Sequence, residues 1–365
     1  MKKRIFSIIA LTLAMVFTLS ACDGCSSLPE LSFTNAFYGG TGLSDQDPQP
    51  YYSETLTYDI DYAETFDGVK IDSKLKEDKN VNFEFSNGSY VSTLEVYKSF
   101  KEASETKGVV FESDIVDSLE ENESHAFYLH TEFSIYAKYT IGEKVVENTE
   151  SIITDAYFCK TALAFAPVYT QTKATYLQFY YSIGEVIKVE TESKTTYQKE
   201  SYSLWNKVTG NKASEEETTT IKYNYKTVID NTQLLFALRN IEVEIEKVDS
   251  IPVVAPSYKE PTSLAINYRE NTSIPYSKEK PLVYNYENVE KPIEVKHYRF
   301  YKNDAKETGA TQHLFIQTKL ENQAESGIED YRALPIRYVE PLTTYGSFSP
   351  MGVLVFTLTN ASIMD

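Results

Sequence analysis

Residues 127–141 carry the longest regular alternation in the chain. Apolar or small side chains occupy every second position and mostly polar ones lie between them; the alternating set is Phe127, Leu129, Thr131, Phe133, Ile135, Ala137, Tyr139 and Ile141. A period of two is typical of a β-strand and incompatible with one face of an α-helix. The segment is therefore predicted to be a strand with one face in a core.

Similar patterns recur along the chain. In residues 56–62 apolar side chains alternate with Thr57, Asp59 and Asp61. Short turn-forming segments that contain glycine separate such runs at 67–68, 87–88, 141–144 and 183–185. Aromatic and β-branched residues are enriched, and no βαβ alternation is found. The predicted fold class is mainly β, built from antiparallel sheets with few short helices.

Two short helices are predicted. Asp230 is a candidate N-cap, and Gln233 follows at the capping-box spacing, which indicates a helix near 230–239. A weaker pattern at 114–121 places Ile115, Val116 and Leu119 on one helical face.

Proline density predicts a domain boundary. Six of the 13 prolines lie between residues 251 and 292, where each removes a backbone donor and fixes φ, so no central strand is expected there. A boundary near 250–262 divides the body into an antiparallel β-rich domain, 51–250, and a smaller β-sandwich-like domain, 263–365, with several short strand candidates.

The amino terminus predicts export. Lys2, Lys3 and Arg4 precede a 15-residue apolar stretch, Ile5 to Leu19. This stretch is shorter than the roughly 20 residues that a membrane-spanning helix needs, and it ends at a small-residue site, so residues 1–21 are predicted to be a signal peptide. A conventional cleaved signal or an uncleaved anchor would be the alternatives.

The ending Leu19-Ser20-Ala21-Cys22 resembles the lipobox of bacterial lipoproteins. The resemblance covers residues 1–22 alone. It implies cleavage before Cys22, a diacylglyceryl thioether on its sulfur, and acylation of the new amino terminus with a chain such as palmitate. Two or three acyl chains give stable anchoring, whereas one gives marginal binding. The implied location is the outer face of the bacterial cytoplasmic membrane, which is the cell surface in a single-membrane organism.

Residues 22–50 are predicted to be a flexible tether, because they are rich in Gly, Asp and Pro and lack periodic apolar residues. Such a tether would reach about 30 Å from the membrane. With Cys22 lipidated, Cys25 and Cys159 are expected to be unpaired thiols, with Cys159 in the core. Cys159 as a nucleophile served by His125 or His130 is the alternative, but no catalytic motif surrounds it.

Charge excludes one class of partner. The formal net charge is -18, and removal of residues 1–21 leaves 32 basic against 53 acidic side chains. Nucleic-acid phosphates are bound mainly through Lys and Arg, so no nucleic-acid partner is expected.

No catalytic residue, metal ligand or cofactor is predicted. The sequence has no nucleophile elbow, phosphate-binding loop or zinc-protease motif. His125 and His130 would point to opposite faces of a strand, which spoils them as a ligand pair. These two, His297 and His313 are all expected to be surface or half-buried strand histidines. Asp59 and Asp61 share a strand face, but no calcium-loop spacing accompanies them.

Function is expected to be non-enzymatic. Tyrosines at i and i+2, as in 223–225 and 284–286, could form a recognition platform, although most are expected in cores. The predicted function is a lipid-anchored binding or interaction module for a cell-wall or peptide ligand. The alternative is a carrier of a lipid or other hydrophobic ligand in a curved-sheet groove, with 230–239 as its lid. A hydrolase would instead require convergent acids or a Cys/His pair.

Overall fold

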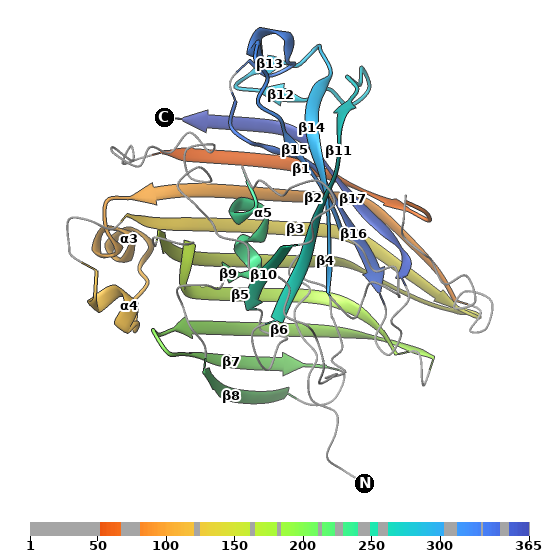
Figure 1. Ribbon diagram of the computed structural model, residues 1–365. Coiled ribbons are helices and arrows are strands. Elements are labelled where there is room, and N and C mark those ends of the chain that lie inside the picture. Colours follow the sequence, from red (N-terminus) through yellow and green to blue (C-terminus); the bar gives the residue numbers. More distant parts are fainter. Residues whose placement is uncertain are drawn as a thin grey trace.

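The computed structural model of the chain, shown in Figure 1, describes a curled sheet whose described pairings are antiparallel except for residues 229–230 with 253–254 and 283–284 with 360–361. The described residues are 52–66, 81–119, 125–160, 165–180, 184–210, 214–222, 229–239, 249–254, 262–302, 312–329, 331–343 and 350–364. Strand content dominates and the few helices are short, so the predicted fold class is confirmed.

The first eight strands pair in the order of the chain, each antiparallel to the next. They are β1 (Ser53–Ala63), β2 (Val81–Tyr97), β3 (Ala126–Ile141), β4 (Lys144–Lys160), β5 (Phe165–Tyr180), β6 (Glu185–Tyr197), β7 (Ser201–Thr209) and β8 (Ser214–Lys222). Their long regular ladders follow from the alternating sequence, since period-two segments place one side-chain set on each face.

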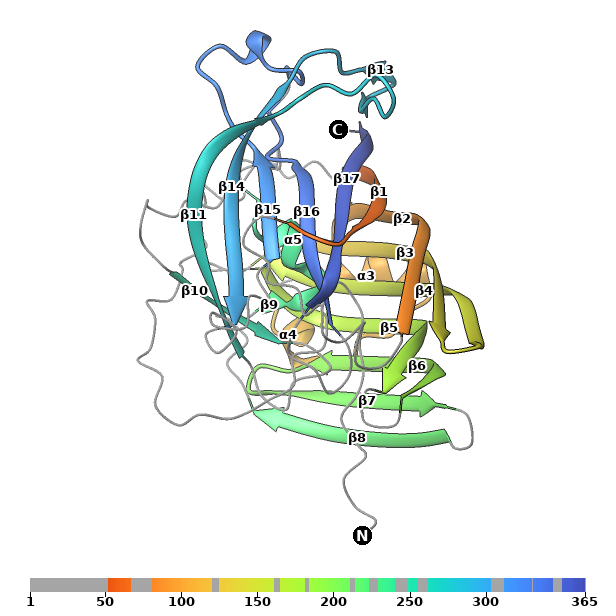
Figure 2. The ribbon, with the colours of Figure 1, turned by 90° about the vertical axis from the view of Figure 1, so that its right-hand side faces the viewer.

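The later strands continue the same sheet from β1. They are β9 (Ile229–Asp230), β10 (Asp249–Val254), β11 (Thr262–Ile274), β12 (Val283–Tyr284), β13 (Glu287–Asn288), β14 (Ile293–Lys302), β15 (Gln312–Gln317), β16 (Pro335–Thr343) and β17 (Pro350–Met364). β17 pairs with β1, and the order then runs β16, β15, β14, β11, β10 and β9. Figure 1 shows β11 and β14–β17 crossing in front of β2–β6, and the turned view of Figure 2 shows them as a layer beside β2–β6, so the sheet curls back over itself.

Strand pairing crosses the predicted domain boundary. β10 and β11, on either side of residues 255–261, are paired with each other, and the first strand pairs with the last. One hydrophobic core cluster contains residues of both predicted domains, among them Phe127 and Phe300. The described strands of 263–365 therefore share a core cluster with those of 51–250.

Pro252 lies inside a strand where none was expected. It is a β10 residue aligned with Ser263 of β11, and β9 pairs on the other side only with Val253 and Val254. The proline thus occupies a position where the second ladder has not begun, so the missing N–H leaves no gap in it.

The Asn87-Gly88 turn prediction is wrong. Both residues lie within β2, at a register shift against β3, and Asn87 has a φ of 51°. A Cβ on Gly88 would lie 2.6 Å from the Cβ of Ile60, so glycine permits a close strand approach here. The Gly142 turn is confirmed between β3 and β4, whereas Asp67-Gly68 lies outside the described residues.

The helix predicted near 230–239 lies inside the curl. It consists of the 3-10 turn η1 (Asn231–Gln233) and α5 (Leu234–Ala237). The Asp230 side chain accepts a hydrogen bond from the Thr232 N–H, as expected of an N-cap, but Gln233 donates to the Phe165 carbonyl instead of completing a capping box. Phe236 packs against Phe165 with ring centroids 5.0 Å apart.

Two further helices cover the other side of the sheet. They are α3 (Phe100–Lys107) and α4 (Asp114–Asp117), and they belong to a second apolar cluster with Tyr128, Tyr157 and Cys159. The helix predicted at 114–121 is present as α4, but it ends at Asp117. The sequence analysis missed α3, although Ser99 and Glu102 have capping-box spacing and Ser99 caps the Glu102 N–H.

Candidate functional site

The candidate site lies on the outer face of the sheet, defined here as the side of β2–β7 opposite the main core. Antiparallel register places its side chains in rows across the strands. One row consists of His130, Asp155, Gln171, Lys194 and Trp205, from five consecutive strands. Its neighbour toward α3 contains Tyr128, Tyr157 and Tyr169. The outer face is thus ordered by pairing and carries mainly polar or amphipathic groups.

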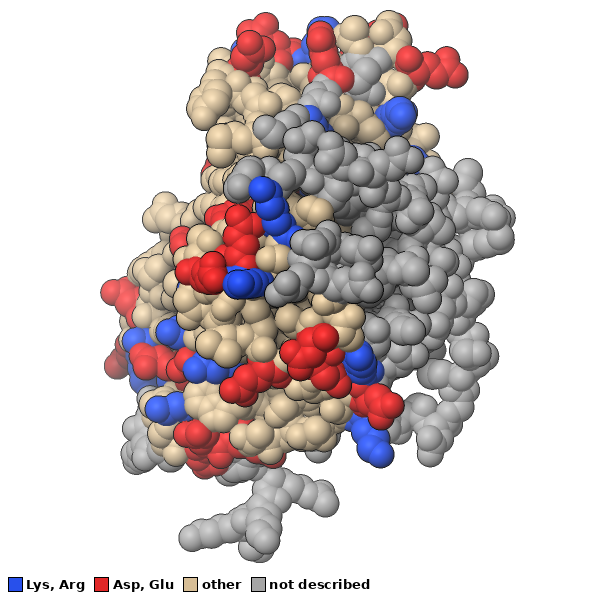
Figure 3. Space-filling view, turned by 90° about the vertical axis from the view of Figure 1, so that its left-hand side faces the viewer, with Lys and Arg blue, Asp and Glu red and all other residues tan. Residues whose placement is uncertain are grey.

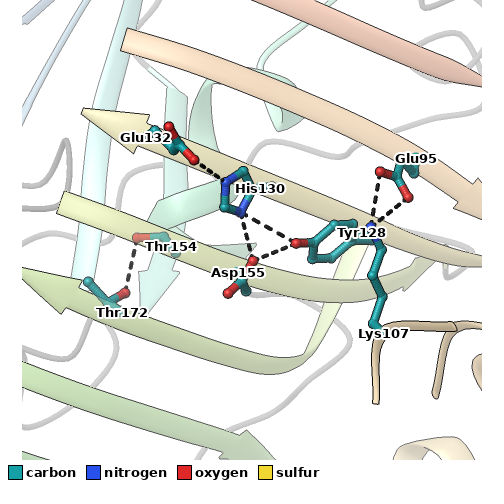
Figure 4. Close-up of polar contacts among 8 residues, drawn as sticks. All are labelled: Glu95, Lys107, Tyr128, His130, Glu132, Thr154, Asp155 and Thr172. Carbon is teal, nitrogen blue, oxygen red and sulfur yellow. Dashed lines mark hydrogen bonds and ion pairs between the residues drawn. The ribbon is translucent and has the colours of Figure 1, made fainter. Parts of the chain in front are cut away.

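A charged cluster centred on His130 occupies one end of this face (Figure 4). The His130 Nδ1 lies 2.8 Å from Asp155 Oδ1, and its Nε2 lies 3.0 Å from Glu132 Oε1. The Tyr128 hydroxyl donates to the same Asp155 oxygen at 2.6 Å. Both imidazole nitrogens therefore face carboxylates.

Electrostatics fixes the protonation of this cluster. The Asp155 hydrogen bond, aided by Glu132, raises the pKa of His130 to about 9, so the ring is an imidazolium at neutral pH. Burial would raise the pKa of Asp155, but hydrogen bonds from His130 and Tyr128 outweigh burial and lower it. Burial and the contact with Asp155 raise the pKa of Tyr128. An imidazolium that donates from both nitrogens has no lone pair for a proton, so the arrangement suits binding better than base catalysis.

Lys107 connects this cluster to α3. Its Nζ lies 2.9 Å from Glu95 Oε2 and 4.2 Å from the centre of the Tyr128 ring. The ammonium is therefore placed over an aromatic face while paired with a carboxylate. Sequence reasoning had no signal for this contact because it joins three separate elements.

A shallow open trough with a volume of about 270 Å³ lies beside the cluster. It crosses the outer face of β4–β7, and its lining includes Ile153, Lys173, Thr175, Glu190, Glu192 and Lys207. Ile153 is 42% exposed, which is unusual for a large apolar side chain in the middle of a ladder. The trough is therefore accessible to solvent, including at this apolar position.

Trp205, the one tryptophan of the chain, lies two residues from Lys207, which lines the trough. Lys194 Nζ lies 5.1 Å from the centre of its ring, and the indole N–H donates to Glu216 at 2.6 Å. On the face in Figure 3, acidic and basic side chains are interspersed despite the strongly negative net charge.

The described residues next to α5 fill the interior of the curl there. Phe127, Phe158, Phe165 and Phe236 form mutual ring contacts with centroids 5.0 to 6.4 Å apart. A cavity of about 20 Å³ remains beside Arg239, room for one or two water molecules. Among the described residues of this interior, no volume of acyl-chain size is present next to α5.

Arg239 forms a buried ion pair with Glu54. Its two terminal nitrogens donate to the two carboxylate oxygens at 2.8 and 2.5 Å, and both side chains are at most 3% exposed. Tyr52 also donates to Glu54, at 3.1 Å. Burial alone would lower the pKa of Arg239, but Glu54 outweighs burial and raises it, so the guanidinium remains charged.

His297 and His313 are a buried contact pair. His297 Nε2 lies 2.9 Å from His313 Nδ1, and the rings stack with centroids 5.2 Å apart. Burial lowers the pKa of His297 to about 4 and that of His313 to about 3, so both rings are neutral in the fold. The sequence analysis treated them as separate strand histidines and missed the pair.

The structure also places other residues that the sequence analysis singled out. Cys159 is fully buried, and burial raises the pKa of its thiol to about 12, which confirms its core position. Lys280 Nζ lies 3.5 Å from Asp59 Oδ2 and 3.0 Å from Asp61 Oδ2. Tyr298 is buried as expected, whereas Tyr286 is 89% exposed.

The lipidation candidate Cys22 and the cleavage residues Leu19, Ser20 and Ala21 lie outside the described residues, as do Cys25 and the 223–225 tyrosines. Within the described part of the chain, no group of three His, Cys, Asp or Glu side chains could hold a metal ion. None of the helices described there is long and apolar enough to cross a membrane.

Comparison with known proteins adds little. No protein-family model matches the sequence, and no curated protein matches it. One solved structure, a β-barrel-like protein of domain of unknown function DUF1849 from Brucella abortus, aligns with 86% of this chain and 98% of its own, at 11% identity and a TM-score of 0.41.

Proposed function

We propose that this chain is a lipid-anchored binding module on the outer face of the bacterial cytoplasmic membrane, and that it acts through surface contacts without covalent chemistry. The lipobox-like ending at Cys22 supports the anchor. The observation that carries the binding role is the contrast between described side chains that are packed beneath α5 and an open, hydrogen-bonded outer face.

The filled interior weighs against the carrier alternative. A groove for an acyl chain would need an apolar volume of several hundred Å³, whereas Phe236 and its aromatic neighbours occupy the space beneath α5. The segment 230–239 acts as a packed core element, because Leu234, Phe236 and Leu238 are all buried.

The anchor can be tested by acyl labelling. The full chain is expressed in a bacterium supplied with an alkyne analogue of palmitate, and label and membrane partition are measured. The parent chain is expected to carry label in the membrane fraction, and Cys22→Ser to lose it. Cys25→Ser is the matched control, since it removes a thiol three residues away and should retain the label. Label that persists in Cys22→Ser would refute the anchor.

Carriage and surface binding can be separated by native mass spectrometry of the chain from residue 23 onward, purified without refolding. The expected mass is that of the chain alone. An additional lipid-sized mass, removed by mild organic extraction, would overturn surface binding as the principal role.

A further inference from the structure

The carboxylates in the trough on the outer face form ion pairs with neighbouring lysines. Lys188 Nζ lies 3.1 Å from Glu190 Oε1, and Lys194 Nζ lies 3.6 Å from Glu192 Oε1. Gln171 also donates to Glu192, at 3.3 Å. Glu190 and Glu192, the two acidic side chains of the trough, therefore contact partners on their own strand or on the adjacent strand.

Two lysines of the trough have no such partner. Lys173 of β5 and Lys207 of β7 are exposed, and neither ammonium group forms an ion pair or a hydrogen bond with any described residue. Both align with Glu192, which lies on the strand between them. Two strand spacings separate their backbones by about 10 Å. The trough therefore contains two unpaired positive charges, although the chain as a whole has a net charge of -18.

The remaining lining is suited to a polar chain. Thr175 and Thr209 offer hydroxyl groups, and Ile153 offers an exposed apolar surface. Hydroxyl groups can donate to or accept from a sugar or polyol, and ammonium groups bind oxyanions with charge-assisted hydrogen bonds.

We propose that this trough binds a polyhydroxylated chain that carries oxyanion groups, either carboxylate or phosphate, and that Lys173 and Lys207 contact two of these groups. The inference rests on the proposed function, since it names the ligand class of the same outer face. Recognition is local, because the overall charge of the protein repels anions at longer range.

Trp205 provides a reporter for this proposal. It is two residues from Lys207, and Lys194 connects its ring to Glu192 of the trough. A ligand that draws Lys173 and Lys207 together would change the field at Glu192 and Lys194. Because the chain has a single tryptophan, any change in emission reports on this site.

The test is a fluorescence titration of the full chain in non-ionic detergent. The probes are an oligogalacturonate, a poly(glycerol phosphate) and a neutral malto-oligosaccharide. A saturable change with either anionic probe, weakened by added salt, is expected, and the anion that acts identifies carboxylate or phosphate as the recognised group. The neutral probe should have no effect.

The variant Lys173→Gln/Lys207→Gln should weaken the anionic response by at least about tenfold, because two charge-assisted contacts are lost. The control Lys101→Gln/Lys144→Gln removes the same charge from exposed positions on α3 and at the start of β4 and should leave the response unchanged. Urea unfolding of both variants verifies that they fold.

An equal response in the trough variant, an equal response to the neutral probe, or no response to either anion would each overturn the proposal. Binding of the neutral chain alone would leave the surface-binding function intact and remove only the anionic subsite. Loss of acyl labelling bears on the anchor and not on this site, so the two failures are distinguishable.

Discussion

The two faces of strands β3–β6 differ in what holds their side chains. On the inner face, apolar residues such as Phe127, Phe133 and Ile152 pack into the main core. On the outer face, partners such as His130 and Asp155 are joined by hydrogen bonds in cross-strand rows. One backbone ladder therefore has two different faces: burial on one side provides stability, and ordered polar groups on the other form the surface that we propose for binding.

The inner face is not uniformly apolar. Thr131, Thr154, Thr172 and Ser193 align across four strands, and Thr154 and Thr172 share a hydrogen bond at 3.1 Å. Figure 4 shows this threonine pair together with the His130 cluster. Buried polar groups of this kind make the inner face sensitive to loss of a partner.

The largest effect is expected at the buried ion pair. Glu54→Ala should lower the free energy of unfolding by about 3–5 kcal/mol, because it leaves the Arg239 guanidinium buried without a counter-charge. Urea unfolding measures this change. A loss below about 1 kcal/mol would show that water reaches Arg239 and that the interior is open.

The double variant Glu54→Leu/Arg239→Met is the control for charge burial. Replacing both ions by apolar groups should recover much of the loss, since the desolvation cost of the pair disappears. If the double variant is as unstable as Glu54→Ala, the ion pair contributes through packing geometry instead.

Neighbouring isoleucines compare the two faces directly. Ile152 is 4% exposed and Ile153 is 42% exposed, and they are adjacent residues of β4. Ile152→Ala should cost about 2–5 kcal/mol through lost burial and a residual cavity. Ile153→Ala should change stability by no more than about 0.5 kcal/mol. Similar losses in both variants would contradict the assignment of inner and outer faces.

Much of this fold could be predicted from sequence. The alternation at 127–141 predicted β3 within a residue, because a half-buried strand imposes its period on composition. The domain division stays a prediction, since proline density marks local backbone limits and carries no information on which distant strands pair. The pairing of β1 with β17 joins residues some 300 positions apart, which local pattern cannot reveal.

The candidate site was less predictable. His130 was identified as a partly exposed strand histidine, but its partner Asp155 lies on the next strand, and register decides that they meet. Lys173 and Lys207 carry no local signal, since their significance depends on the absence of acidic partners in the fold. The lipobox-like residues remain a sequence prediction.

Glu150 should give the inner face a pH-dependent stability. Burial raises the pKa of its carboxyl from 4.5 to about 7, while the Leu177 N–H lowers it in part. The folded state therefore holds a proton between these values that the unfolded state releases, so stability should fall as pH rises from about 4.5 to 7. The cost should reach about 3 kcal/mol above pH 7.

Glu150→Gln keeps the acceptor for the Leu177 N–H and removes the ionisation. Its stability relative to the parent chain should therefore increase across the same pH range, as measured by urea midpoints between pH 4 and 9. A constant difference across this range would show that Glu150 is solvated.

The smallest effect is expected from His130 on the outer face. Its folded pKa, about 9, lies above the unfolded value of 6.5, so its stabilising contribution is complete below pH 6.5 and is lost as pH rises through 9. His130→Gln should cost no more than about 1 kcal/mol at pH 6, since the ring is partly exposed and solvent screens the pair, and almost nothing at pH 10.

Proton NMR of the imidazole measures the pKa of His130 directly. Asp155→Asn should lower this pKa more than Glu132→Gln does, because Asp155 makes the shorter contact and is the less exposed carboxylate. The reverse order would place the dominant partner of His130 on its own strand and would remove the cross-strand basis for the outer-face rows.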